Sequence, residues 1–143
     1  MENILKNTDT PICFAQGLYG FENFTKFMLA DSEYAPLMWL QSQEEKALAF
    51  LTVDPFLFFP QYEIDVDDET VEELDIANPE DVYVLAIVTV SKTTPVAITA
   101  NLQGPIVINR KNNKARQIVL ADRKWRTKHD LFEQKPNNPS SAC

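Results

Sequence analysis

Hydrophobic residues along this chain mostly recur at every second position or stand in short continuous runs, and both patterns are typical of β-strands. The pattern predicts nine strands, at residues 12–15, 25–30, 37–41, 47–53, 62–66, 82–90, 96–102, 106–109 and 117–121. The run "VYVLAIVTV" at 82–90 is apolar at most positions, which predicts a central strand covered on both faces. One short helix is predicted at 67–74, with Asp67 or Asp68 as its N-cap.

Turn signals between these runs suit a closed β structure. The segment "RKNNKARQ" separates two apolar runs, and its Asn residues tolerate the positive φ of a hairpin turn. Pro60, Pro79, Pro95 and Pro105 fall between the predicted elements. We therefore expect an all-β, compact single-domain β-barrel-like fold of about nine or ten short strands with one short helix. The domain is predicted to span residues 1–134, and the polar segment 135–143 is predicted to be a disordered C-terminal tail.

Composition narrows the class of protein. No apolar run approaches the roughly 20 residues that a membrane span needs, and the polar start lacks the features of a signal peptide. Cys13, in an apolar run, is interpreted as a small core residue, and a disulfide with Cys143 in the polar tail is not expected. A cytoplasmic protein with no membrane association is the expectation.

Candidate catalytic residues are few. His129 is the single histidine, and without a neighbouring Cys or a Ser in a Gly-rich elbow it is interpreted as a surface residue. Metalloprotease, CxxC and phosphate-loop motifs are absent, and the carboxylates at 67–69 lack the spacing of a calcium loop. A pair of distant carboxylates of the glycosidase type stays open at this point. We expect no enzyme, no metal and no cofactor.

Charge is distributed unevenly along the chain, whose net charge is −8. Residues 1–90 contain 18 acidic and 3 basic residues, whereas residues 91–143 contain 3 acidic and 10 basic residues. Ten carboxylates and no basic residue lie between Glu63 and Asp81. Such a segment repels nucleic acid and attracts basic proteins, although a solvated face that only aids solubility is equally consistent.

The basic C-terminal part and the aromatic run "DPFLFFPQY" each have two interpretations. The basic residues around Trp125 could grip nucleic acid, or they could pair with the acidic segment or protect a sheet edge. Most of the aromatic run is expected to fill the core. If Phe56 and Phe58 face inward, Phe59 is exposed at a strand end and contributes to a protein-docking surface.

Several motifs together resemble the flagellar assembly factor FliW. They are "GLYGFENFTKFML", "LQSQEEKALAFLTVDPFLFFPQY", "EDVYVLAIVTV", "TANLQGPIVIN" and "RQIVL", in this order from about Phe14 to Asp130. "TANLQGPIVIN" is the most specific of them. Gly104 stands where an Ala is frequent in the family, and the segment from Glu63 to Asp81 is of a type that varies.

The resemblance implies a β-barrel-like binding protein without catalysis. FliW-type proteins bind the RNA-binding translational repressor CsrA, at a site other than its RNA-binding face, and relieve the repression of flagellin synthesis. They also bind flagellin, which frees CsrA to repress. Direct nucleic-acid binding is not expected.

Candidate partner-binding residues follow from this resemblance and the charge pattern. The acidic Glu69, Glu72, Glu73 and Asp75 are predicted to attract CsrA. Phe58, Phe59 and Tyr62 are predicted to contribute to a groove for a flagellin helix. "TANLQGPIVIN" is interpreted mainly as scaffold, with a buried Asn101 bonding across a bend or bulge, or else with Thr99, Asn101 and Gln103 on a partner surface.

Two alternatives remain open. One is a flagellin-binding export adaptor or chaperone that does not antagonise CsrA. The other is a small RNA-binding β-barrel that uses Lys111, Lys114, Arg116 and Arg126.

Overall fold

The computed structural model describes residues 9–91 and 97–132. Within these ranges it contains nine strands, one α-helix and two short 3₁₀-helices. The strands are β1 (Thr10–Phe14), β2 (Lys26–Asp31), β3 (Met38–Ser42), β4 (Ala49–Val53), β5 (Val82–Val90), β6 (Ile98–Ala100), β7 (Ile106–Asn109), β8 (Lys114–Gln117) and β9 (His129–Asp130). The helices are η1 (Pro55–Leu57), α2 (Asp68–Glu73) and η2 (Pro79–Asp81).

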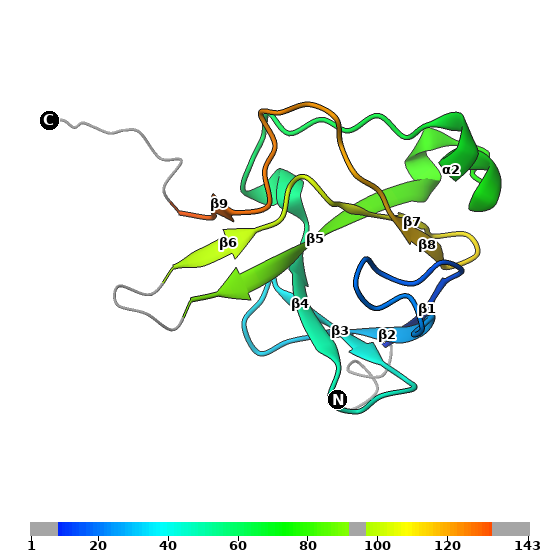
Figure 1. The fold of residues 1–143 in the computed structure, drawn as a ribbon, viewed down its shortest axis with the longest axis horizontal. Helices are drawn as coiled ribbons and strands as arrows, with labels where there is room; N and C mark the ends of the chain where they lie inside the picture. The colour runs from blue at the N-terminus through cyan, green and yellow to red at the C-terminus, as the bar shows by residue number, and fades with distance from the viewer. Residues whose placement is uncertain (1–8, 92–96, 133–143) are drawn as a thin grey trace, which may run out of the picture.

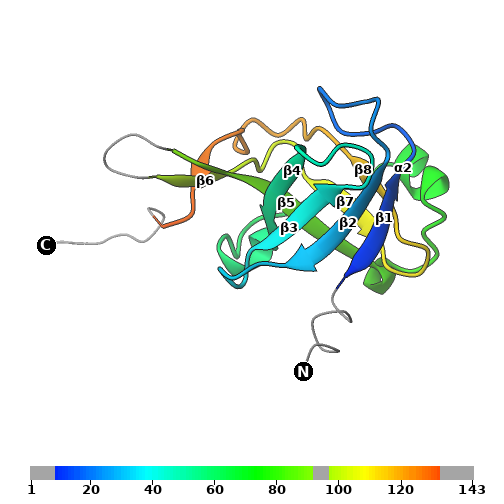
Figure 2. The same cartoon turned by 90° about the horizontal axis from the view of Figure 1, so that it is seen from below.

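Seven of the strands close into a barrel (Figures 1 and 2). Strands β1 to β5 pair antiparallel in chain order, and β5, β7 and β8 continue the antiparallel sheet. The parallel pair β1–β8 closes the ring. Strand β5 extends beyond the barrel, where β6 pairs with it and β9 pairs with β6, so that this part of the sheet projects outward (Figure 1). The predicted all-β barrel-like fold with one short helix is confirmed.

The core has two parts because the sheet has two covered regions. Alternate residues of the barrel strands point inward, and they form a cluster that contains Phe14, Phe27, Leu40, Leu85 and Ile108. The second cluster lies where the segments after β4 and β8 cover the outside of the barrel, and it contains Tyr62, Leu74, Leu102, Trp125 and Leu131. Each fully buried side chain of this size contributes roughly 1.5–3 kcal/mol to folding.

Several predicted elements are confirmed closely. Strands β5 and β7 have the predicted bounds, 82–90 and 106–109. Helix α2 begins after Asp67, whose carboxylate accepts a hydrogen bond of 2.9 Å from the Thr70 N–H. The β7–β8 hairpin has its turn at the predicted place, and Asn113 there has a φ of 62°. Local alternation and turn chemistry were sufficient for these elements.

Other predictions are wrong in identifiable ways. Residues 62–66 belong to no sheet, because Ile64 and Val66 pack on the second core cluster while the neighbouring backbone finds no strand partner in register. The last predicted strand, 117–121, is displaced: the tight turn brings Lys114–Gln117 into register with β7 instead. Cys13 is exposed, since it alternates with the buried Ile12 and Phe14. The predicted tail at 135–143 and the start of the predicted strand at 96–102 lie outside the described residues.

The motif "TANLQGPIVIN" forms a long bulge between β6 and β7. Residues 101–105 span a gap that lies opposite only Ala86 and Ile87 of β5. The Asn101 side-chain oxygen accepts hydrogen bonds from the N–H groups of Gln103 (3.1 Å) and Gly104 (2.9 Å). The prediction that Asn101 bonds within a bend is confirmed, and a contact of Asn101 or Gln103 with a partner stays a prediction.

Candidate partner-binding surface

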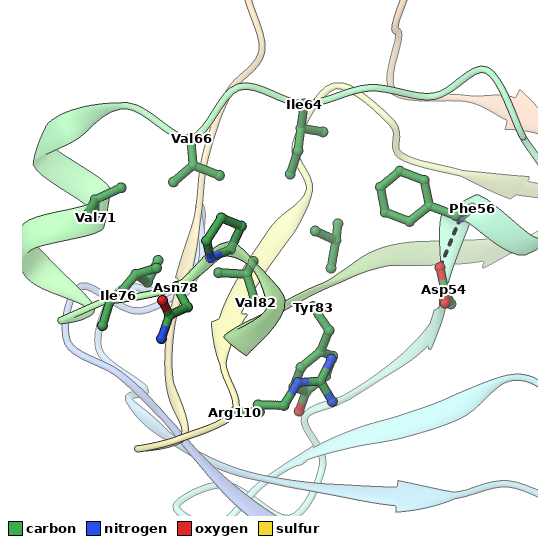
Figure 3. Close-up of a pocket in the computed structure, with 13 residues that line it drawn as sticks. Asp54, Phe56, Ile64, Val66, Val71, Ile76, Asn78, Val82, Tyr83 and Arg110 are labelled. Atoms are coloured by element: carbon green, nitrogen blue, oxygen red, sulfur yellow. Dashed lines mark hydrogen bonds between the residues drawn. The ribbon is translucent and has the colours of Figure 1, made fainter.

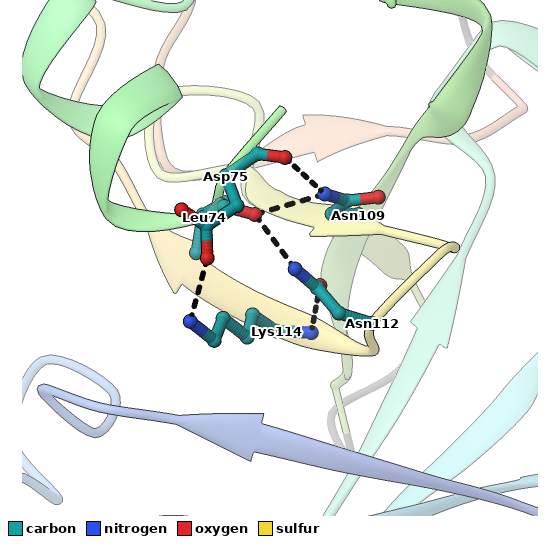
Figure 4. Close-up of polar contacts among 5 residues, drawn as sticks. All are labelled: Leu74, Asp75, Asn109, Asn112 and Lys114. Carbon is teal, nitrogen blue, oxygen red and sulfur yellow. Dashed lines mark hydrogen bonds and ion pairs between the residues drawn. The ribbon is translucent and has the colours of Figure 1, made fainter. Parts of the chain in front are cut away.

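The C-terminal end of helix α2 is fastened to the β7–β8 hairpin by two asparagines (Figure 4). The Asn109 amide donates to the carbonyls of Leu74 (2.8 Å) and Asp75 (3.1 Å), and the Asn112 amide donates to Leu74 (3.0 Å). Asp75 adopts a φ of 56°, which ends the helix. The last carbonyls of a helix have no partner within it, so these amides satisfy groups that would otherwise be orphaned.

Three ion pairs join α2 and the following Asp75 to strand β8. Lys114 lies 2.9 Å from Asp75, and hydrogen bonding to that carboxylate raises the pKa of Lys114. Arg116 lies 2.8 Å from Glu73 and 3.9 Å from Glu69. The interpretation that basic residues pair with the acidic segment of the same chain is confirmed for these two. Of the four cations that the RNA-binding alternative uses, Lys114 and Arg116 are therefore engaged internally.

The exposed carboxylates on and directly after α2 form an acidic face that we define as Asp68, Glu69, Glu72 and Asp75. All four are exposed, and the Glu69 side chain retains 74% of its accessible surface. Glu73 differs, because its side chain is only 20% exposed and is turned toward Arg116. Asp67 is occupied as the N-cap, and its hydrogen bonds from Thr70 lower its pKa. Three of the four acidic residues predicted to attract a basic partner thus face solvent, and Glu73 does not.

Phe59 and Tyr62 lie in the second core cluster, where most of the aromatic run was expected, so the alternative in which Phe59 is exposed is wrong. Phe59 is 8% exposed and Tyr62 is 2% exposed. The Tyr62 hydroxyl donates to the Leu102 carbonyl (2.7 Å), and burial raises the pKa of this hydroxyl. The reason for the error is η1: Pro55 begins a 3₁₀ turn instead of continuing β4, which breaks the alternation on which the prediction depended.

Other apolar side chains of this region are exposed. Phe56 is 42% exposed, Leu57 is 61% exposed and Phe132 is 54% exposed. The half-buried Phe58 packs edge-to-face on Phe132, with ring centroids 6.0 Å apart. We call Phe56, Leu57, Phe58 and Phe132 the η1 patch. Of the three aromatic residues predicted to bind a partner, Phe58 alone belongs to it.

His129 is half-buried among aromatic rings, which differs from the surface position expected for it. Its ring centroid lies 5.9 Å from those of Phe59 and Trp125. Its Nε2 accepts a hydrogen bond of 2.8 Å from the Arg126 N–H, which requires that nitrogen to be unprotonated. Burial, and secondarily the charge of Arg126, lower the pKa of His129. The neutral imidazole therefore supports the packing of β9.

An apolar groove of about 630 Å³ lies between α2, β5 and η1 (Figure 3). Its walls are aliphatic side chains from distant parts of the chain, namely Ile64, Val66, Val71, Ile76, Val82 and Val84. Asp54 and Arg110 provide charge at its edge, and the Arg110 guanidinium lies 4.8 Å from the centre of the Tyr83 ring. The sequence prediction did not include this groove, although the alternation of Ile64 and Val66 with acidic residues was a partial signal.

The described residues contain no group of three or more His, Cys, Asp or Glu side chains that could hold a metal ion. Within the same residues, no helix is long and apolar enough to cross a membrane.

Comparison with known proteins identifies relatives over nearly the whole chain. The sequence profile of a family described as "FliW protein" matches residues 2–131. The "Flagellar assembly factor FliW" of Treponema denticola is 50% identical over 118 residues, which is 82% of this chain and 80% of the relative. The protein of the same name from Bacillus subtilis is 44% identical over 121 residues, with 84% of each chain covered. A crystal structure of the flagellar assembly factor FliW superposes with a TM-score of 0.79 at 41% identity, covering 85% of both chains.

Proposed function

The chain belongs to the FliW family of flagellar assembly factors, and we propose that it works in the cytoplasm by binding two proteins in alternation. One partner is the translational repressor CsrA, whose repression of flagellin synthesis ends when it is bound. The other partner is flagellin, which displaces CsrA. In this proposal the protein has no catalytic step, and its activity is the exchange of partners.

The observation that carries the CsrA half of the proposal is the acidic face of α2. Internal ion pairs engage Glu73 and Asp75 and reach Glu69 at 3.9 Å, yet Asp68, Glu69 and Glu72 remain exposed on a short helix. A fixed cluster of one charge attracts a basic partner and orients it during the encounter. Glu73 supports this face indirectly: its ion pair with Arg116 neutralises a positive charge that would otherwise weaken the negative charge of the acidic face.

For flagellin, the η1 patch is the surface that we propose. Phe56 and Leu57 lie on a 3₁₀ turn that Asp54 caps, with a hydrogen bond of 2.9 Å from the Phe56 N–H, and Phe58 follows the turn and packs on Phe132. Clustered apolar side chains on a rigid turn can anchor the apolar stripe of an amphipathic helix. Phe59 and Tyr62 take part indirectly, since they form the core on which η1 rests.

Calorimetric titration of the full chain with CsrA from the same cell, alone and with flagellin already bound, tests this proposal. We expect saturable binding of CsrA that is lost when flagellin is present. Binding of flagellin without any binding of CsrA would instead indicate the export adaptor. Retardation of flagellin leader RNA by this protein alone in a gel shift would indicate the RNA-binding barrel.

A further inference from the structure

One edge of β5 lacks a strand partner along part of its length. Strand β4 pairs with β5 only from Leu51↔Val88 to Val53↔Ala86. In the same register, the next pair that could exchange hydrogen bonds would be Pro55 opposite Val84. However, proline has no N–H to donate, and Pro55 already belongs to η1. The Pro55 carbonyl is also used elsewhere, since it accepts from the N–H groups of Phe58 and Phe59. The hydrogen-bonded pairing of β4 with β5 therefore ends at Ala86, one hydrogen-bonded pair before Val84.

The backbone groups of Val82 and Val84 are directed toward this open edge. On the opposite edge, the Asp81 carbonyl accepts from Arg110 and the Ile87 carbonyl accepts from Asn101, both on the side of β6 and β7. The N–H and C=O of one residue point to the same side of a strand, and successive residues alternate. Even-numbered residues of β5 thus face away from β7. The Val82 N–H is used by Pro79, which leaves the Val82 carbonyl and both groups of Val84 without a strand partner among the described residues.

This edge opens into the apolar groove. Val82 and Val84 line the groove on one side, and Ile64, Val66 and Val71 point into it from the other (Figure 3). Along residues 63–66 the burial alternates, so that Glu63 and Asp65 face solvent while Ile64 and Val66 face inward. The groove is therefore an apolar slot that has main-chain hydrogen-bonding groups on one wall, with one residue of each charge, Asp54 and Arg110, at its edge.

We propose that this groove receives an extended segment of a partner protein, which adds as a strand to β5 at Val82–Val84. A helix has no free main-chain groups along its length, so only an extended segment can pair with the Val84 N–H and C=O. Its inward side chains would be apolar at alternate positions, to fill the space beside Ile64, Val66 and Val82. Where the segment passes Asp54 it would carry Lys or Arg, because Asp54 is the carboxylate that lines the groove, whereas Arg110 lines it with the opposite charge.

Amide hydrogen exchange of the ¹⁵N-labelled full chain, followed by NMR, tests the strand directly. The probes are purified CsrA, purified flagellin and a synthetic heptapeptide of alternating Lys and Val. In the free chain we expect fast exchange at Val84 and slow exchange at its neighbour Leu85, which pairs with Ile106. At least one probe is expected to slow exchange at Val84 by roughly tenfold or more, because a new hydrogen bond protects the amide.

The outcomes separate this inference from the proposed function. Protection of Val84 by any probe supports the added strand, even if only the peptide does so and neither protein binds. Binding of CsrA or flagellin by calorimetry, with Val84 unchanged by every probe, overturns the strand and leaves the proposed function intact. Slow exchange at Val84 in the free chain overturns it too, because another part of the chain would already cover the edge. No binding and no protection by any probe rejects both.

Two variants that each gain one lysine, one inside the groove and one outside it, test the assignment to the groove. Ile64→Lys introduces a cation among the aliphatic walls and is expected to abolish the protection of Val84. Val119→Lys adds the same charge at a residue that is 59% exposed and does not line the groove, and it is expected to leave the protection unchanged. Equal loss in both variants would contradict the assignment to the groove. Val66→Lys replaces Ile64→Lys if the latter does not fold.

Discussion

The Gln117 side chain connects its own motif, "RQIVL", with two other sequence motifs of this protein. Its Oε1 accepts a hydrogen bond of 2.9 Å from the Tyr19 N–H in the loop "GLYGF". Its Nε2 donates to the Gly104 carbonyl (2.9 Å) in the bulge of "TANLQGPIVIN". Gly104 lies close to it, since a Cβ there would stand 3.1 Å from the Gln117 Nε2. These motifs lie apart in the sequence but meet at one buried amide, so their residue choices depend on one another.

Replacement of this amide should therefore destabilise the fold without touching the acidic face. Gln117→Leu keeps the approximate size but leaves the Tyr19 N–H and the Gly104 carbonyl without their partner. We expect a loss of about 2 kcal/mol in the free energy of unfolding, measured by urea denaturation. Gln43→Leu, at an exposed position, is the control and should change stability little. A Gln117→Leu protein as stable as the wild type would show that these two bonds are not required.

At the scale of elements, the sequence predicted those whose pattern is local. Strand β5, strand β7 and the hairpin turn depend on alternation and turn residues within a few positions. Strand β8 was misplaced because the apolar run after Gln117 is a stronger strand pattern than "KARQ", and only pairing with β7 decides between them. The groove was not predictable, because Asp54, Ile64, Val84 and Arg110 meet only after the barrel closes.

Strand β9 shows how a two-residue element depends on its surroundings. It pairs with β6 through Ala100↔His129 and Thr99↔Asp130, too short a pairing to persist without support. Support comes from Leu131, which is buried, and from the contacts of the neutral His129 ring with Phe59 and Trp125. The stability of this region should consequently depend on the protonation of one imidazole.

Acidification is expected to weaken the fold through His129. Its pKa in the folded chain is lowered from an ordinary value near 6.5, so the unfolded chain binds more protons between the two values. The free energy of unfolding therefore falls as the pH drops below about 6.5, and this contribution is fully present above it. Urea denaturation from about pH 7.5 to about 5.5 should show the decline in the wild type. His129→Gln, which can still accept from the Arg126 N–H but does not titrate, should show a flatter profile. Identical profiles for the two proteins would remove His129 as the cause.

At the scale of the whole molecule, acidic residues concentrate in the first part of the chain and basic residues in the last part. The fold brings only some of these opposite charges together. The segment from Glu63 to Asp81 has ten carboxylates, and strand β8 brings Lys114 and Arg116 against one end of it. These cations hold α2 in place but contact only Glu69, Glu73 and Asp75. The negative field that remains on the acidic face is thus a consequence of how the barrel closes. A field of this kind affects the rate of association more than the strength of the complex.

Reversal of charge on the acidic face should therefore slow association with a basic partner. We expect Glu69→Lys/Glu72→Lys to lower the association rate constant for CsrA about tenfold at low salt, measured by stopped-flow fluorescence. Both side chains are exposed, and Glu69 lies 3.9 Å from Arg116, whereas reversal of Glu73 would break the closer pair of 2.8 Å with that residue. Asp31→Lys/Glu33→Lys makes the same change in net charge at exposed residues elsewhere, so it separates local steering from overall charge. In about 1 M salt, where the Debye length is about 3 Å, the three proteins should associate at similar rates. Equal rates at low salt would exclude steering by α2 and leave this face as a solvated surface.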